Sequence, residues 1–265
     1  RRAKKYVNRN RYYYDELTRF FKFIIPANSS VLELGSTIGN IIGNLGQDYA
    51  NRIGLETGAE LLNFASQMYP DVSFVSEWSN VTSKNEKFDY VIMADSLGFI
   101  PDIQEALDSI QQATTESSRV IISFQNFLWL PVLTIAEWLH LKVKTKRLNW
   151  LNEMDILNFL NLSGFEVIKK GKRILFPINI PLISFLMNRI IAHLPILNRL
   201  CLVSYIIAKP VRKVIDQESV SIVVPARNEA GNIKNIIERI PPFHKNIEII
   251  FIEGHSTDNT FQEIE

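Results

Sequence analysis

The sequence VLELGSTIGN, from Val31 to Asn40, joins an apolar strand candidate to a turn that holds two glycines. Gly35 lets the backbone turn sharply and approach a ligand, because no Cβ stands in the way. Gly39 can do the same where the next helix begins. The first N–H groups of that helix lack helical partners, so they can bind a carboxylate or a phosphate. The segment therefore predicts a strand, a glycine turn and a helix, with a ligand at the turn.

Strand and helix candidates alternate through the first 210 residues. The predicted strands span residues 31–34, 52–56, 72–75, 88–94, 119–123, 165–169 and 202–208. The predicted helices span 59–68, 103–112, 127–141 and 154–162, after a helical lead-in over the first 30 residues. This alternation predicts βαβ units and a mostly parallel sheet. Ligands of such sheets bind at the carboxyl ends of the strands.

Acidic residues stand at the ends of four successive strand candidates: Glu33, Glu56, Glu77 and Asp95. Glu56 is placed to accept hydrogen bonds from both hydroxyls of a ribose. Glu77 and its neighbour Trp78 suit an adenine, as an acceptor for the amine and a flat apolar wall. Each residue alone has an ordinary reading, as a solvated strand end or as packing. Solvated acids have no reason to follow strand ends, so the set predicts a cofactor site.

The predicted cofactor-binding residues are Glu33, Gly35, Ser36, Gly39, Asn40, Glu56, Thr57, Glu77, Trp78, Asp95 and Ser96. This arrangement resembles the class I S-adenosylmethionine-dependent methyltransferases over about residues 8–210, with segments 33–39, 54–56, 74–78, 88–95 and 162–167 similar to their motifs. The resemblance implies a seven-stranded Rossmann-like sheet with helices on both faces, S-adenosylmethionine as cofactor and methyl transfer as activity. Thr37 departs from the family's middle glycine. Gly98-Phe99 stands where many relatives carry Glu-His, so no histidine base is carried over.

The acceptor and the catalytic base stay open at this point. Asp95 and Tyr14 are weak candidates for the base, and the run Tyr12-Tyr13-Tyr14 reads equally well as a packed helix. The acceptor is expected to be a small molecule, a glycan or a lipid-linked group. The apolar segment 174–200 is either a cover for that acceptor or a core-packing insertion, and its two arginines would suit a phosphate head group.

A second α/β pattern follows a polar linker at residues 211–218, with strands predicted at 220–224 and 247–252 and a helix at 230–240. We therefore divide the chain into a domain at 1–210, the linker, and a fragment at 219–265. The fragment resembles the opening of inverting glycosyltransferases of the GT-A fold, family 2. The resemblance implies a nucleotide-sugar pocket lined by Pro225, Arg227, Glu229, Glu253 and Asp258. The family's metal motif and catalytic base are absent from this sequence, so we expect a truncated unit, without glycosyl transfer, whose remainder belongs to the full-length protein.

Composition narrows the classes of partner. A net charge of +1 gives no global attraction to nucleic acid. Cys201 is the only cysteine, which excludes an internal disulfide, and the four histidines lack metal-ligand spacing, so no metal site is expected. We expect no signal peptide at the start of this sequence, and its longest uncharged stretch, 174–188, is too short to span a membrane. We expect a cytoplasmic protein, with its basic clusters either solvated or in peripheral contact with a membrane.

Two other functions remain open from the residues alone. One is a non-catalytic module that docks or regulates the glycosyltransferase, because Thr37 and Gly98-Phe99 depart from the family pattern. The other is a nucleotide-dependent oxidoreductase on a similar sheet. A dinucleotide-binding oxidoreductase would require a G-x-G-x-x-G turn, and the spacing of Gly35, Gly39 and Gly43 does not match that motif.

Overall fold

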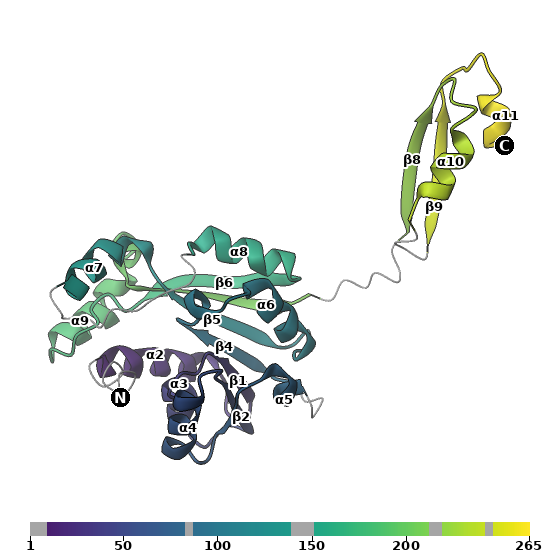
Figure 1. Ribbon diagram of the computed structural model, residues 1–265. Coiled ribbons are helices and arrows are strands. Elements are labelled where there is room, and N and C mark those ends of the chain that lie inside the picture. The colour runs from purple at the N-terminus through teal and green to yellow at the C-terminus, as the bar shows by residue number, and fades with distance from the viewer. Residues whose placement is uncertain (1–9, 83–86, 139–150, 212–218, 242–245) are drawn as a thin grey trace. The chain divides into compact units, whose positions relative to one another are not determined.

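The computed structural model describes residues 10–82, 87–138, 151–211, 219–241 and 246–265. The chain divides into two compact units, which we call unit 1 (Arg1–Arg212) and unit 2 (Lys213–Glu265) (Figure 1). Within the described ranges, no helix is long and apolar enough to cross a membrane.

Unit 1 is built on one seven-stranded sheet. Its strands are β1 (Ser30–Leu34), β2 (Asn51–Leu55), β3 (Ser73–Val75), β4 (Tyr90–Ala94), β5 (Arg119–Gln125), β6 (Phe165–Arg173) and β7 (Val203–Pro210). They lie in the order β3-β2-β1-β4-β5-β7-β6, with β1 to β5 parallel and β7 antiparallel to both of its neighbours. The predicted seven-stranded, mostly parallel sheet is confirmed. The order reverses direction between β1 and β4, and this is where such sheets bind ligands.

Helices cover both faces of this sheet (Figure 1). The helices of unit 1 are α2 (Arg11–Ile24), α3 (Asn40–Asn44), α4 (Ala59–Met68), α5 (Trp78–Thr82), α6 (Ile103–Gln112), α7 (Leu130–Trp138), α8 (Glu153–Leu162) and α9 (Ile183–Arg189), with short 3-10 turns η1 (Leu97–Phe99), η2 (Phe127–Trp129), η3 (Ile191–His193) and η4 (Leu197–Leu200). Side-chain caps fix the two helices nearest the core. Asp102 accepts from the Glu105 N–H at the start of α6, and Asn152 with Asp155 forms a capping box on α8.

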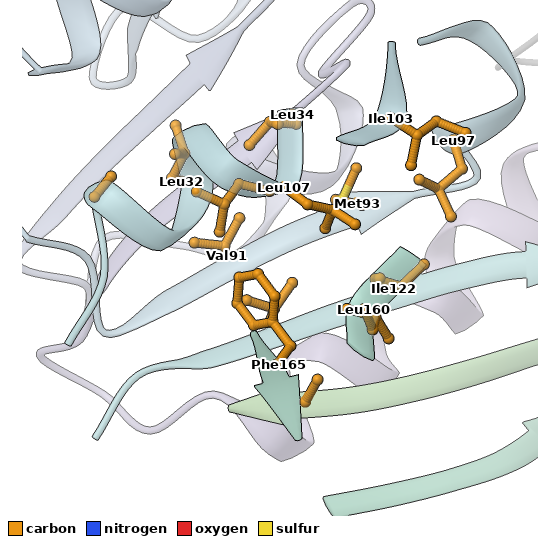
Figure 2. Close-up of a cluster of buried hydrophobic side chains, with 14 of the residues drawn as sticks. Leu32, Leu34, Val91, Met93, Leu97, Ile103, Leu107, Ile122, Leu160 and Phe165 are labelled. Atoms are coloured by element: carbon orange, nitrogen blue, oxygen red, sulfur yellow. The ribbon is translucent and has the colours of Figure 1, made fainter. Parts of the chain in front are cut away.

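Alternation along the strands sends side chains to two cores. On one face Leu32, Val91 and Ile122 pack against α6 and α8, as Figure 2 shows. On the other face Val31 and Ile92, the chain neighbours of Leu32 and Val91, pack against α2 and α3. Burial on both faces explains why these strands read as continuous apolar runs. This double-sided core fixes the strand ends that carry the site.

Several boundaries differ from the predicted ones. The strand β6 extends to Arg173, beyond the predicted end at 169. The predicted helix 127–141 begins with the η2 turn and is described only to Trp138, while 139–141 and the start of the lead-in helix lie outside the described residues. The segment 174–200 folds as α9, η3 and η4, which are separated by turns.

Unit 2 is a smaller parallel β-α-β arrangement. It contains β8 (Val220–Ala226), α10 (Ile233–Arg239), β9 (Ile247–Glu253) and α11 (Thr260–Ile264), with β8 and β9 paired in parallel. The predicted helix 230–240 is shorter at both ends. Alternate residues of both strands are exposed, among them Val223, Ile250 and Ile252, which leaves an apolar sheet face uncovered.

Candidate functional site

A cavity of about 850 Å³ opens at the carboxyl ends of β1, β2 and β4 in unit 1. Every predicted cofactor-binding residue except Gly39 lines it, and so does Tyr14. The cavity therefore forms where parallel strands end and the sheet order reverses.

The β1–α3 turn forms the floor of the cavity and has an unusual backbone. Gly35, Thr37 and Gly39 all have positive φ, at 70°, 51° and 73°. A Cβ on Gly35 would lie 2.7 Å from the Cβ of Ser96, so only glycine fits there. Thr37 adopts the left-handed conformation that a glycine would take without strain, which is costly for a β-branched residue.

Gly39 serves packing between elements. A Cβ on Gly39 would meet the ring of Phe74 on β3 at 2.5 Å. The residue therefore lets α3 approach the neighbouring strand and does not line the cavity. The sequence placed Gly39 in the site because both glycines of the turn look alike without the packing partner.

Glu33 lies inside β1 and not at its tip. It is 2% exposed, and its carboxyl Oε2 accepts a hydrogen bond from the Ile42 N–H at 3.0 Å. One of the first-turn N–H groups of α3 that were predicted to bind a ligand, that of Ile42, is thus used by this carboxyl group. Burial raises the pKa of Glu33 to about 8, further raised by nearby Glu56 and opposed by the hydrogen bond from Ile42. Glu33 is therefore mostly neutral at pH 7, and it supports the turn from beneath.

Glu56 ties two loops together at the end of β2. Its Oε2 accepts from the Thr37 N–H and its Oε1 from the Gly58 N–H, both at 2.8 Å. Burial raises the pKa of Glu56, and the two backbone hydrogen bonds oppose that rise. Each carboxylate oxygen has a further lone pair, so Glu56 keeps acceptor capacity toward the cavity.

Glu77 and Trp78 lie on the turn between β3 and α5. Glu77 is exposed and accepts from the Ser79 hydroxyl at 3.2 Å, while Trp78 is half-buried as the first residue of α5. Thr57 and Asn40 line the cavity beside the turn residues. The structure thus brings the residues predicted for an adenosine to the same cavity.

Asp95 follows β4 in the left-handed conformation, at φ 53°. Its carboxylate accepts from the buried Tyr13 hydroxyl and from the Ser123 hydroxyl, the latter at 3.3 Å. The three adjacent tyrosines therefore have different roles. The Tyr12 hydroxyl accepts from Asn188 at 3.2 Å, Tyr13 holds Asp95, and Tyr14 lines the cavity.

Two serine hydroxyls beside the turn have unmet hydrogen-bonding capacity. In the described part of the chain, Ser36 Oγ and Ser96 Oγ are buried without any hydrogen-bond partner, and both residues line the cavity. Buried polar groups normally find partners, so an unpaired pair at one cavity points to a polar ligand.

The cavity also contains residues that the sequence did not reveal. These are mainly Leu61, Phe99, Ile100, Pro101, Asp102, Glu105 and Gln125. They come from α4, from η1 with the loop that leads to α6, from the first turn of α6, and from the end of β5. Phe99 gives the cavity an apolar wall. With the acids already named, the lining holds six carboxyl groups, and none of its described residues is Lys, Arg or His.

Unit 2 also brings its predicted residues to one edge. Glu253 at the end of β9 accepts from the His255 and Ser256 N–H groups, and Asp258 accepts from the Ala230 and Thr260 N–H groups. The Glu229 N–H donates to the Thr260 hydroxyl at 2.7 Å.

Two further predicted residues complete this edge. Arg227 is exposed on the loop after β8, and Pro225 lies on the open face of β8. Hydrogen bonding lowers the pKa of Glu253 through Ser256 and that of Asp258 through Thr260. Within the described ranges, no cluster of His, Cys, Asp and Glu could hold a metal ion.

Comparison with known proteins identifies the family of unit 1. The family model of a methyltransferase domain matches residues 6–170, which is more than half of the chain. A search of curated proteins finds no match.

Solved structures share the fold at low identity. One is described as a SAM-dependent methyltransferase, possible histamine N-methyltransferase, from Thermotoga maritima, at 16% identity and a TM-score of 0.57, covering 80% of this chain and 95% of that one. Another is a S-adenosylmethionine-dependent methyltransferase from Clostridium acetobutylicum, at 14% identity and a TM-score of 0.51, covering 76% of this chain and 92% of that one. A third is a magnesium protoporphyrin IX methyltransferase from Synechocystis with bound SAH, at 17% identity and a TM-score of 0.50, covering 78% of this chain and 87% of that one.

The predicted methyltransferase class is thereby confirmed, whereas none of these comparisons reports a glycosyltransferase in unit 2. The chain belongs to the methyltransferase domain family.

Proposed function

We propose that unit 1 binds S-adenosylmethionine in the acid-lined cavity and transfers its methyl group to a neutral or cationic acceptor. The carrying observation is the cavity lining, whose described residues include six carboxyl groups, with Glu33 the mostly neutral one, and no basic side chain. A sulfonium is a cation, so this lining attracts it. A dinucleotide brings two phosphates, which would meet no cation among the described lining residues, and the Ile42 N–H that could bind one is taken by Glu33. The oxidoreductase alternative is therefore not favoured.

The residues present fit this cofactor. Glu56 would hold the ribose hydroxyls with its remaining lone pairs, and Glu77 with Trp78 would hold the adenine. The orphaned hydroxyls of Ser36 and Ser96 and the bare Gly35 give a polar cradle that a Cβ would fill. The cofactor, S-adenosylmethionine, supplies a methyl group that is already activated for displacement.

The chain's own contribution to the reaction is mainly positioning. Tyr13 and Ser123 hold the Asp95 carboxylate in place. Asp95 Oδ1, which has the longer of the two hydrogen bonds, holds the proton of an acceptor O–H or N–H group. Phe99 and Pro101 add apolar walls that exclude water. An anionic acceptor would meet like charge, so neutral glycan hydroxyls or amines fit better.

Co-purified ligands and methyl transfer test this function together. We expect S-adenosylmethionine or its demethylated product in mass spectra of the denatured chain, and transfer of labelled methyl to glycolipid extracts. A nicotinamide dinucleotide in the spectra would contradict the proposal. Cofactor binding with no transfer to any extract would favour the non-catalytic module.

We further propose that unit 2 is the first β-α-β element of a nucleotide-sugar-binding domain. The parallel pairing of β8 with β9, the carboxylates at their ends and the uncovered apolar sheet face support this proposal. A sugar-handling neighbour supports a glycan or lipid-linked acceptor for unit 1.

Saturation-transfer NMR with nucleoside diphosphates tests the role of unit 2. We expect signals that weaken in Glu253→Gln but persist in Glu248→Gln, which changes the same residue type at the other end of β9. Absence of signals, or equal signals from both variants, would exclude a nucleotide site here.

A further inference from the structure

Unit 1 exposes many large apolar side chains in one region. We call this region the apolar flank and define it as residues 127–138 and 178–200. Its exposed members include Phe127, Leu128, Val132, Ile135, Trp138, Ile178, Leu182, Ile183, Phe185, Leu186, Ile190, Leu194, Ile196 and Leu200. Figure 1 draws α7 and α9 at the same end of unit 1. Scattered exposed apolar residues are ordinary, but so many in two joined segments mark an interaction surface.

Hydrogen bonds join the two segments of the flank. The Asn126 amide donates to the carbonyls of Arg199 and Cys201, at 2.9 and 2.8 Å. The Trp129 indole donates to the Leu200 carbonyl at 2.6 Å. The end of β5 therefore holds η4 in place, and the exposed apolar groups on both segments belong to one structure.

Within residues 178–200 the usual placement of polar and apolar groups is reversed. Ser184 and Asn188 are buried, while Leu182 is 84% and Phe185 is 63% exposed. The Ser184 hydroxyl bonds to the backbone of Ile178 and Ile180. The Asn188 side chain likewise bonds to the backbone at residues 175 and 176. The segment thus satisfies its own backbone from within and turns its hydrocarbon outward, as a surface in contact with lipid does.

The charge around the flank is mainly positive. Residues 174–200 contain no Asp or Glu and carry Arg189 and Arg199, while the other segment of the flank carries one acid, Glu137. The edge strand β6 adds Lys169, Lys172 and Arg173, and it is joined to the flank because Lys172 donates to the Arg199 carbonyl at 3.3 Å. This excess of positive charge complements anionic lipid better than it complements a second copy of the same face.

We infer that the apolar flank docks unit 1 on the surface of a membrane that contains anionic lipid. The exposed side chains enter the boundary between head groups and acyl chains, and the β6 cations meet the phosphates. No helix in the described ranges is long enough to cross.

The helix α2 links the flank to the cavity. Arg189 forms an ion pair with Glu16 of α2 at 3.6 Å, and Asn188 donates to Tyr12, while Tyr13 and Tyr14 of the same helix reach Asp95 and the cavity. Docking would therefore bring the methyl-transfer site close to lipid-borne molecules. The docking itself does not depend on the proposed activity.

Flotation of the whole chain with vesicles tests the inference. Vesicles of phosphatidylcholine mixed with phosphatidylglycerol should carry the chain, pure phosphatidylcholine should carry less, and high salt should release part of it. The double variant Leu182→Ser/Phe185→Ser should lower the vesicle partition coefficient by about tenfold or more, because it removes two immersed hydrocarbon groups. The matched control Leu162→Ser/Phe23→Ser changes the same residue types at sites that are 73% and 81% exposed but lie outside the flank. It should partition like the unaltered chain.

Thermal melting and cofactor binding verify that both variants are folded. No flotation of the unaltered chain with either vesicle would overturn the inference. Equal loss of partition in the double variant and its control would do the same. A sedimentation shift from a dimer to a monomer in the double variant, without any effect of vesicles, would assign the flank to a second copy of the chain and also overturn it.

Discussion

Two groups of carboxylates lie at or near the ends of parallel strands in this molecule, and their surroundings differ. In unit 1, Glu33 and Glu56 are buried beside a cavity, and burial raises the pKa of both. In unit 2, Glu253 ends β9 and Asp258 lies in the loop after it, and hydrogen bonds from Ser256 and Thr260 lower the pKa of each. The same sequence pattern, an acid at or near the end of an apolar strand, therefore gives opposite electrostatic outcomes.

Enclosure explains this contrast. Seven strands with helices on both faces desolvate the strand ends of unit 1 and leave a cavity there. Carboxylates of both units accept hydrogen bonds from nearby backbone N–H groups, but two strands cannot exclude water from their loops, so those of unit 2 stay solvated.

The largest effect is expected from Gly35→Ala. The added Cβ would meet Ser96 at 2.7 Å, and φ is positive, so we expect a loss of about 3 kcal/mol in stability and at least a hundredfold loss of cofactor affinity. Gly46→Ala is the matched control, because Gly46 also has positive φ, at 107°, but nothing lies within 4 Å of an added Cβ. It should lose only about 1 kcal/mol and keep its affinity. Urea melts measure the stability of each variant, and calorimetry measures its cofactor affinity. Equal losses of stability and affinity in the two variants would show that backbone strain alone matters.

The next effect concerns pH. Glu33 has a folded pKa of about 8 against 4.5 when unfolded, so its contribution is complete below pH 4.5 and is lost as pH rises through 8. We expect the free energy of unfolding of the unaltered chain to fall by on the order of a few kcal/mol across that pH window. Glu33→Gln should remove this decline. Urea melts at several pH values measure it. An unchanged slope in the variant would mean that Glu33 is not buried as described.

These residues also show what the sequence could predict. Periodicity located α4 and α6 at their observed bounds, because amphipathic spacing is local information. The glycine turn and the acids after β2, β3 and β4 indicated the cavity, because parallel strands bring their ends together.

Contacts formed by packing could not be predicted. The sequence could not separate Tyr13 from Tyr14, place Glu33 under α3, or add Phe99 and Gln125 to the lining, since each depends on a distant partner. It also gave no sign that Thr37 would keep the left-handed turn of a glycine.

A smaller effect is expected from Tyr13→Phe. The hydroxyl holds Asp95, and a hydrogen bond to a charged group contributes about 1.5–3 kcal/mol. We expect about tenfold slower methyl transfer with the same cofactor affinity, because Tyr13 acts through Asp95 as a positioning residue. Tyr49→Phe removes a hydroxyl that bonds to the Ile25 carbonyl, and it should leave transfer unchanged. If Tyr13→Phe lost cofactor affinity as well as rate, Tyr13 would instead be needed to keep the site folded.

The smallest effect is expected in unit 2. The folded pKa of Asp258 lies below its usual value of 3.8, so its contribution is present above that pH and is lost as pH falls through the lowered pKa. This sign is opposite to that of Glu33. Amide protection factors of α11 and its preceding loop, which are corrected for the intrinsic pH dependence of exchange, should fall below pH 4 in the unaltered chain and be low at all pH values in Asp258→Asn. Protection factors that are independent of pH in the unaltered chain would contradict the comparison.

Calorimetric titration of Glu56→Gln with S-adenosylmethionine tests the central claim most directly. Glu56 is the buried carboxylate that joins the glycine turn to the second strand and faces the cavity. We expect one site in the unaltered chain, affinity lower by about tenfold or more in Glu56→Gln, and full affinity in Glu116→Gln, which changes an exposed glutamate outside the cavity lining. Equal affinity in all three chains, or tighter binding of a nicotinamide dinucleotide, would contradict the account.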